Sequence, residues 1–284
     1  MSPTPDHSHA TFTPEWLALR EEADTDARAT APLDPLRAHL TARGAGPGGR
    51  PIRVTDLGCG TGAQGRWLAP RLAGPQTWML HDLDPRLLNL AGAHTPRTSA
   101  DGSTVQARMH LRDLNRISAT DLADTDLVTG SALLDLLTRD QVLAIARAAD
   151  EAGCAALFTL TVTGRVDLYP SHPADPDITT AFNDHQRRAG LLGPDATAFT
   201  AQTFLSLGRR VLTYPSPWRL LPEHTDLTRA WLRGRLRAAT EQHPASVPSD
   251  YPRHRLDQCE RRELGAVVHH TDLLALPDGY PGHP

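Results

Sequence analysis

Lysine is absent from this sequence of 284 residues, and all 29 of its Lys and Arg side chains are arginine. Schiff-base chemistry, a pyridoxal phosphate anchor and a phosphate-binding loop of the Walker A type each require a lysine. A Tyr-x-x-x-Lys dehydrogenase dyad requires one as well. This absence therefore excludes several classes of enzyme before any motif is considered.

Cysteine is scarce too, and Cys59, Cys154 and Cys259 lie far apart without a Cys-x-x-Cys pair. An odd number at such spacing is typical of reduced thiols and predicts neither disulfides nor a metal site. Aromatic residues make up only 5% of the chain, so the core must consist largely of Leu, Ala and Val. We expect a cytoplasmic protein, because no apolar run approaches the roughly 18 residues of a membrane span and no signal peptide is recognisable.

An excess of positive charge is also missing, since the formal net charge is −4. Nucleic acid is therefore not an expected partner, and neither is a membrane. One local exception is Arg229, Arg233 and Arg237, which repeat at helical spacing and predict a basic helix face. Such a face is usually solvated, and an anionic acceptor or an acidic partner is the alternative. The sequence does not indicate an oligomeric state.

Strand-like runs alternate with helical stretches over the first half of the chain. The expected strands are 52–57, 77–82, 109–112, 126–129 and 155–160, and the expected helices are 64–72, 85–93, 117–122 and 139–151. This alternation predicts an α/β fold with a doubly wound, mostly parallel sheet and helices on both faces. The last of these helices has the clearest boundaries, because Thr138 and Gln141 form a capping-box pattern and Gly153 follows it.

A Gly- and Pro-rich stretch at 44–49 divides the chain into two expected parts. Residues 1–49 are expected to form a helical N-terminal cap with a linker, and residues 50–284 the main domain. Within that domain, 164–195 are rich in Pro, Asp and His and predict an irregular substrate or lid segment with one short helix near 181–188. Helices at 194–207, 226–241 and 253–263 and strands at 210–214 and 266–272 complete the expected order.

The most informative motif follows the first expected strand and reads Asp56-Leu-Gly-Cys-Gly-Thr-Gly62. Glycine permits a sharp turn at the carboxyl end of a strand and lets a ligand approach the main chain. The helix that comes next presents free N–H groups and the positive end of its dipole. Because ligands of open α/β sheets bind in this crevice, the motif predicts a cofactor site.

Two kinds of cofactor fit such a loop. Gly60-x-Gly62-x-x-Gly65 matches the dinucleotide fingerprint, with Asp82 or Asp84 on the ribose, and indicates an NAD(P)-dependent oxidoreductase. The longer Asp-x-Gly-x-Gly-x-Gly order instead resembles motif I of the class I S-adenosylmethionine-dependent methyltransferases. Later segments follow that family's order, namely His81-Asp-Leu-Asp-Pro85, Arg112-Asp-Leu114 and Asp126-Leu-Val-Thr-Gly-Ser131. We favour this second interpretation, because a dinucleotide loop normally takes its first glycine directly from the apolar strand.

The resemblance implies a seven-stranded sheet with an antiparallel last strand, S-adenosyl-L-methionine as cofactor, and O- or N-methylation of a small-molecule acceptor. It implies that the cofactor is bound at the glycine loop and at the ends of the next strands, by Asp56, Gly58, Cys59, Gly60, Gly62, Asp82, Leu83, Asp113, Leu114 and Ser131. In some relatives a cap helix folds over the cofactor and an arginine pairs with its carboxylate. Here Arg20 is the candidate and Arg28 lies in the same cap, while a solvated surface position is the alternative.

No motif identifies a catalytic base. Asp135 and His185 are the candidates, beside Tyr169, His172 and Asp184 in the same region of the chain. The Asn/Asp-Pro-Pro-Tyr/Phe sequence of relatives that methylate adenine or glutamine amino groups is missing after the fourth strand, and no acidic metal cluster is evident. A cofactor-binding protein without catalysis is a further alternative, which predicts tight cofactor binding and no methyl transfer.

Overall fold

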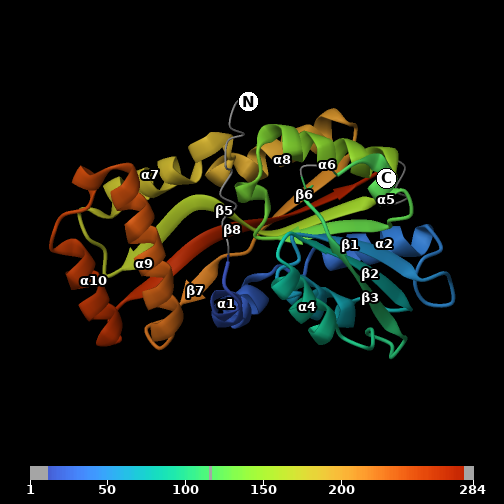
Figure 1. The fold of residues 1–284 in the computed structure, drawn as a ribbon, viewed down its shortest axis with the longest axis horizontal. Coiled ribbons are helices and arrows are strands. Elements are labelled where there is room, and N and C mark those ends of the chain that lie inside the picture. Colours follow the sequence, from blue (N-terminus) through green and yellow to red (C-terminus); the bar gives the residue numbers. More distant parts are fainter. Residues whose placement is uncertain (1–11, 115–116, 278–284) are drawn as a thin grey trace, which may run out of the picture.

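A single mixed sheet runs through the whole molecule in the computed structural model, which describes residues 12–114 and 117–277 (Figure 1). The strand order is β3-β2-β1-β4-β5-β8-β6, and a short strand β7 pairs with β8 beside this path. The strands are β1 (Ile52–Leu57), β2 (Gln76–Asp82), β3 (Val105–Leu111), β4 (Leu127–Ser131), β5 (Ala155–Tyr169), β6 (Arg210–Pro215), β7 (Trp218–Leu220) and β8 (Gly265–Leu276).

The first five strands are parallel, and β8 runs antiparallel to each of its neighbours β5, β6 and β7. The doubly wound, mostly parallel sheet with an antiparallel last strand is therefore confirmed. The sheet has eight strands, however, because β7 adds a short pairing that the sequence analysis did not predict. The register aligns Asp56 of β1 with Leu80 of β2 and Thr129 of β4. The carboxyl ends of these strands consequently meet at one edge, where a ligand crevice is expected.

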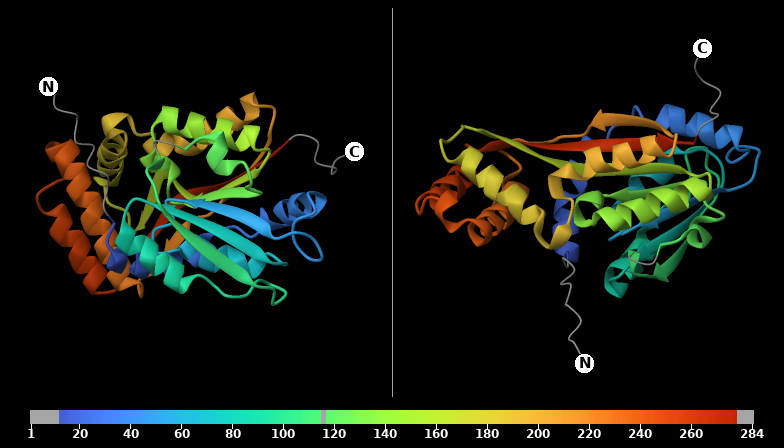
Figure 2. Two further views of the ribbon diagram at one scale, coloured as in Figure 1. Left: turned by 45° about the vertical axis from the view of Figure 1, so that its right-hand side comes forward. Right: turned by 90° about the horizontal axis from the view of Figure 1, so that it is seen from above.

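Helices cover both faces of the parallel part (Figure 2). One face packs against α2 (Leu33–Ala42), α3 (Ala63–Leu68) and α4 (Pro85–His94), through a core that includes Leu36, Leu68 and Trp78. The other face packs against α5 (Ala119–Leu122), α6 (Arg139–Glu151) and α8 (Ala196–Ser206), through a second core that includes Ile145 and Phe204. Each apolar helix stripe thus covers one side of the sheet, as binary patterning requires.

The strands β5 and β8 extend well beyond the parallel part, and a third hydrophobic cluster surrounds their far ends (Figure 1). The helices α7 (Asp175–Gln186), α9 (Thr225–Gln242) and α10 (Tyr251–Glu260) form this end together with β7. The helix α1 (Pro14–Ala27) joins the same cluster through Trp16 and Ala23. The molecule therefore has the parallel part of the sheet at one end and a helical extension at the other.

Several boundaries differ from the expectation, and the two largest differences concern β5 and α7. The strand β5 continues to Tyr169 and does not end at residue 160, and α7 begins at Asp175, before the short helix expected near 181–188. The sequence does not reveal that β5 continues beyond residue 160. Leu160 and Gly164 have positive φ, and the pairing of β5 with β8 shifts register around them. Such irregularities interrupt the apolar alternation by which a strand is recognised. Within the described ranges, no helix has the length and apolarity needed to cross a membrane.

Candidate functional site

The glycine loop lies at the carboxyl end of β1 and adopts a backbone that glycine favours. Gly58, Gly60 and Gly62 have φ of 60°, 54° and 86°, in the left-handed region that L side chains rarely adopt. The Gly60 amide donates a 2.8 Å hydrogen bond to Oδ2 of Asp82, which fixes the loop to the tip of β2. A Cβ on Gly62 would come within 3.1 Å of the Ala91 Cα, so this glycine allows α4 to pack closely.

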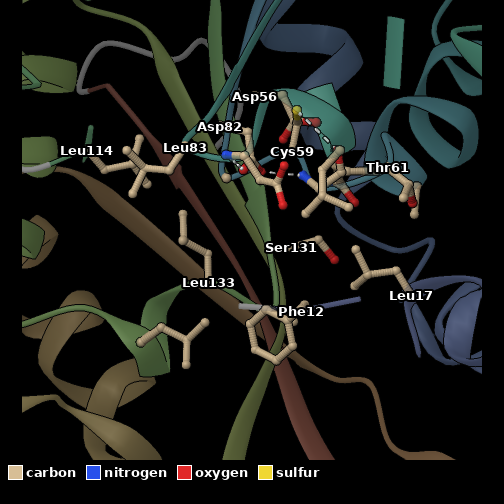
Figure 3. A pocket seen from close by; sticks show the side chains of 18 of the residues that line it. Phe12, Leu17, Asp56, Cys59, Thr61, Asp82, Leu83, Leu114, Ser131 and Leu133 are labelled. Atoms are coloured by element: carbon tan, nitrogen blue, oxygen red, sulfur yellow. Dashed lines mark hydrogen bonds between the residues drawn. The ribbon is translucent and has the colours of Figure 1, made fainter. Parts of the chain in front are cut away.

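A cavity of about 1650 Å³ opens beside this loop (Figure 3). It brings together five separate segments of the chain, and nearly all the residues predicted from the sequence to bind the cofactor line it. These are Arg20, Asp56, Gly58, Cys59, Gly60, Asp82, Leu83, Asp113, Leu114 and Ser131. Gly62 is not among its lining residues. Figure 3 shows the carboxylates of Asp56 and Asp82 on one side and Phe12, Leu17 and Leu133 on the other.

Asp56 is a buried acid without a partner. Its side chain is 1% exposed, and neither carboxylate oxygen has a hydrogen-bond partner among the described residues. Burial raises the pKa of Asp56 to about 8, against an ordinary value near 3.8. A buried carboxyl of this kind is costly unless it meets a donor or a cation. Its place in the cavity wall therefore indicates a ligand that supplies one.

Arg28 is the complementary group, at the carboxyl end of α1. It is 4% exposed, and its Nη2 donates a 3.0 Å hydrogen bond to Oγ of Ser131. Its Nε and Nη1 atoms have no partner among the described residues, and burial lowers the pKa of its guanidinium. A buried cation with two unused donors requires an acceptor with a negative charge. Arg28 and Asp56 thus line one cavity, and each has side-chain polar atoms without a hydrogen-bond partner among the described residues.

Arg20, the cap arginine preferred from the sequence, lines the same cavity in a different state. Its Nε and Nη2 atoms bind the two oxygens of Asp24 at 2.9 and 3.0 Å. Its guanidinium also lies over the ring of Trp218, 4.8 Å from the ring centroid. With its donors directed at a carboxylate of the same helix, Arg20 is less suited than Arg28 to hold a ligand anion. Sequence spacing alone did not distinguish these two arginines of the cap.

The end of β2 carries two acids with different tasks. Asp82 accepts from the amides of Gly60 and Asp84, at 2.8 and 2.9 Å, and its carboxylate faces the cavity. Asp84 accepts from the Arg86 amide at 2.8 Å and is the N-cap of α4, as its position before Pro85 indicates. Asp113 and Leu114 line the cavity at the end of β3, next to the half-exposed Leu83.

None of the candidate bases lines the cavity. Asp135 is buried, although Leu133 and Leu136 of the same segment line the cavity, and burial raises its pKa to about 6. His185 lies on α7, with Nε2 3.3 Å from Glu241 of α9. The remaining candidates lie on the helical extension, where Tyr169 is 59% exposed, His172 packs against Tyr251 and Asp184 pairs with Arg187. In the described ranges, no group of three His, Cys, Asp or Glu side chains is arranged to hold a metal ion.

Another part of the cavity wall is mostly apolar, and we call it the acceptor wall. Its two polar side chains, Thr138 and Gln141, bond to each other's backbone in the capping box of α6. The acceptor wall consists of Phe12, Leu17, Ala132, Leu133, Leu136, Leu137, Thr138, Gln141, Ala189 and Leu191. Of the expected lid segment 164–195, only Ala189 and Leu191 thus line the cavity.

No protein-family model and no curated protein matches this sequence. Solved structures resemble the fold at low identity. A putative sarcosine dimethylglycine methyltransferase from Galdieria sulphuraria matches with a TM-score of 0.47 and 11% identity, over 93% of this chain and 97% of the other. A cyclopropane synthase from Mycobacterium tuberculosis has a TM-score of 0.46 and 11% identity, over 93% and 99%.

A third similar structure is a methyltransferase from Geobacter sulfurreducens in complex with S-adenosyl-L-homocysteine. Its TM-score is 0.45 and its identity 16%, over 93% of this chain and 98% of the other. These likenesses identify neither the cofactor nor the substrate of this chain.

Proposed function

We propose that this chain is an S-adenosyl-L-methionine-dependent methyltransferase with a small-molecule acceptor. One observation supports this above the others: Asp56 and Arg28 are buried beside the glycine loop in the wall of a single cavity, and both have polar atoms that lack a hydrogen-bond partner among the described residues. An amino acid carries an ammonium and a carboxylate on one carbon, so its two charges match this pair. The methionine end of the cofactor is such an amino acid, and its carboxylate fits the two unused donors of Arg28.

The remaining cavity residues fit the nucleoside. Asp82 faces the cavity from the tip of β2, where a carboxylate accepts hydrogen bonds from ribose hydroxyls. Leu83 and Leu114 offer apolar surface for a flat base, and Asp113 provides an acceptor for its amino group. The glycines leave the main chain open to close approach. Each of these roles follows the expectation from the sequence, except that Arg28 takes the place of Arg20.

A dinucleotide fits this site poorly. The pyrophosphate of NAD would lie at the glycine loop, where the carboxylate of Asp82 lines the cavity and would repel it. The sheet differs as well, because the antiparallel β8 is inserted between β5 and β6. The common dinucleotide-binding order has six strands in the order 3-2-1-4-5-6 and no such insertion. The geometry thus supports the sulfonium cofactor over the alternative that the glycine pattern left open.

When bound, the cofactor supplies an electrophilic methyl group on its sulfonium. The protein must align the acceptor with that group and exclude water, and the acceptor wall does both. The charged pairs Arg20–Asp24 and Asp84–Arg86 at its border are already formed. A charged acceptor would lose its hydration there without a new partner, which costs several kcal/mol. Apolar surface gains roughly 25 cal/mol per Å² buried, so we infer a small apolar acceptor.

Calorimetry with S-adenosylhomocysteine and NADH tests the cofactor assignment. We expect S-adenosylhomocysteine to bind and NADH not to bind. Arg28→Met should weaken this binding by about 10- to 100-fold, since a charged hydrogen-bond partner of the carboxylate is lost. Arg86→Met is the matched control, because Arg86 also lines the cavity but pairs with Asp84. Binding of NADH alone would refute the proposal.

Matched acceptors test the substrate class. Thiols, phenols and anilines would be offered in matched pairs with labelled S-adenosylmethionine, one member of each pair bearing an added carboxylate. We expect the uncharged member to be methylated faster, and Leu191→Asp to slow that transfer. Leu205→Asp, at a 52% exposed position on α8, should leave it unchanged. Faster transfer to the carboxylate member would refute an apolar acceptor, and cofactor binding without transfer to any compound would favour a protein that only binds the cofactor.

A further inference from the structure

Asp272 lies near the middle of β8 and joins three separate segments of the chain. Its side chain is fully buried, and its two oxygens serve different partners. Oδ1 accepts from the Leu160 amide of β5 at 2.8 Å and from the Ser216 hydroxyl at 2.5 Å. Oδ2 accepts from the Ala29 amide at 2.8 Å. One oxygen thus holds the sheet together, and the other holds the turn between α1 and α2.

The residue next to Ala29 is Arg28, whose guanidinium reaches the cavity and contacts Ser131. The chain turns at this point, because α1 ends at Ala27 and Arg28 has an extended backbone with φ −57° and ψ 129°. Outside a helix, the direction of a side chain depends on what fixes the adjacent peptide. For Arg28 that anchor includes the Ala29–Asp272 hydrogen bond, which links it to β8 across more than 240 positions of sequence.

A purely structural role explains Asp272 poorly. Burial raises the pKa of its carboxyl, so ionisation at this position is opposed by its surroundings. The two bonds within the sheet use one oxygen only, and a neutral acceptor would supply that oxygen at a lower desolvation cost. The second oxygen is what a carboxylate adds, and its partner is the turn that carries Arg28. The negative charge also favours the cationic form of Arg28, whose guanidinium is buried nearby.

We propose that Asp272 is a positioning residue for ligand recognition: it anchors the α1–α2 turn so that Arg28 presents its free donors to the carboxylate of the bound amino acid. This inference rests on the proposed function, since it requires a ligand with an amino-acid end. It assigns to β8 a part in cofactor selectivity, although Asp272 is not among the residues that line the cavity.

Two substitutions each remove one hydrogen bond to the Asp272 carboxylate, and comparing them distinguishes the positioning of Arg28 from a general contribution to stability. Ala29→Pro removes the amide that donates to Oδ2, and the extended backbone of Arg28 suits a residue before proline. Ser216→Ala removes a donor to Oδ1 and leaves the turn bonded. Asp272→Asn is a second variant, in which the amide loses one backbone N–H partner in either orientation.

The readout is calorimetric binding of two probes, S-adenosylhomocysteine and 5′-methylthioadenosine, which lacks the amino-acid end. We expect Ala29→Pro to lower the affinity for S-adenosylhomocysteine about 10-fold or more and to leave the affinity for 5′-methylthioadenosine unchanged. Ser216→Ala should change neither affinity. Combined with Arg28→Met, Ala29→Pro should add no further loss, because both changes remove the same contact.

Three results would overturn the inference while leaving the proposed function intact. The first is an unchanged affinity of Ala29→Pro for S-adenosylhomocysteine. The second is an equal loss of affinity for both probes in Ala29→Pro and Asp272→Asn. The third is a double variant in which Ala29→Pro lowers the affinity as much as it does alone. If Ala29→Pro does not fold, the probe comparison in Asp272→Asn decides alone. If the unaltered protein binds neither probe, the proposed function itself fails.

Discussion

At the scale of single residues, the cavity contains an acid whose charge state should change on ligand binding. Burial places the pKa of Asp56 at about 8, so at pH 7 the carboxyl of the free protein is mostly protonated. An ammonium placed beside it favours the ionised form. Binding of S-adenosylhomocysteine at pH 7 should therefore release up to about one proton per site, and fewer as the pH rises past 8. Calorimetry in buffers with different ionisation enthalpies measures this number.

Asp56→Asn is the control, and it should abolish the proton release. The same variant tests the sign of the effect on stability. Because the pKa of Asp56 is raised in the folded state, its contribution to the free energy of unfolding is fully present below about pH 4 and is lost as the pH rises through 8. The ligand-free protein should thus lose stability relative to Asp56→Asn over that window. Proton release that persists in the variant would assign it to another group.

The ribose contact is the second prediction at this scale. Asp82→Ala should weaken the binding of S-adenosylhomocysteine by ~1.5–3 kcal/mol, or roughly 10- to 100-fold. The reason is that a charged group that accepts hydrogen bonds from the two ribose hydroxyls is lost. The Gly60 amide loses its acceptor too, so the loop becomes less ordered. Asp84→Ala, which removes only the N-cap of α4 and its pair with Arg86, should change affinity far less. Equal losses in the two variants would show that the ribose assignment is wrong.

At the scale of helices and strands, local signals determined what the sequence could predict. Helix α6 begins and ends as expected, because Thr138 and Gln141 form the capping box and Gly153 has a positive φ just beyond its end. Strand β1 also has the expected bounds, since an apolar run ends directly at the glycine loop. Strand β7 and the far half of β5 were missed, because β7 has only three residues and the far half of β5 lies beyond the irregular positions Leu160 and Gly164.

The candidate site followed the same division. The residues in the glycine loop and at strand ends were predictable, because parallel strands bring their carboxyl ends together. The choice of Arg28 over Arg20 was not, since it depends on Asp24 binding Arg20 and on Asp272 holding the turn after α1. The first is an i,i+4 pair within α1, which the sequence analysis did not use. The second joins segments more than 240 positions apart, which no sequence pattern encodes.

The capping box of α6 gives a prediction for this helix as a whole. Thr138→Ala removes the hydroxyl that accepts from the Gln141 amide and should cost ~1 kcal/mol of unfolding free energy. For a chain of this size that corresponds to a fall in Tm of roughly 2–4 °C. Thr240→Ala is the control, because its hydroxyl only donates back to the Leu236 carbonyl inside α9. A change in Tm equal to that of the control would show that the cap contributes nothing.

At the scale of the whole molecule, the question is whether the parallel part of the sheet and the helical extension unfold together. The extension has its own hydrophobic cluster, yet β5 and β8 run through both ends. Helix α1 also connects them. Its Glu21 pairs with Arg66 of α3, and its Asp24 accepts from the indole of Trp218 on β7. These links predict a single cooperative unit, in which a change at one end alters the stability measured at the other.

Arg255 of α10 tests this cooperativity. It is fully buried at the far end and donates to both oxygens of Asp175 at 2.7 Å, so Arg255→Ala should cost about 3–5 kcal/mol. Arg253→Ala, on the exposed side of the same helix, should cost almost nothing. S-adenosylhomocysteine at 100 times its Kd adds about 2.7 kcal/mol to the folded state. If the molecule unfolds as one unit, calorimetry should show one transition, lowered by Arg255→Ala and raised by the ligand to the same extent in both proteins. The opposite result is two transitions, of which Arg255→Ala lowers the temperature of one and the ligand raises the temperature of the other. It would show that the extension unfolds independently and that α1 does not couple it to the cavity.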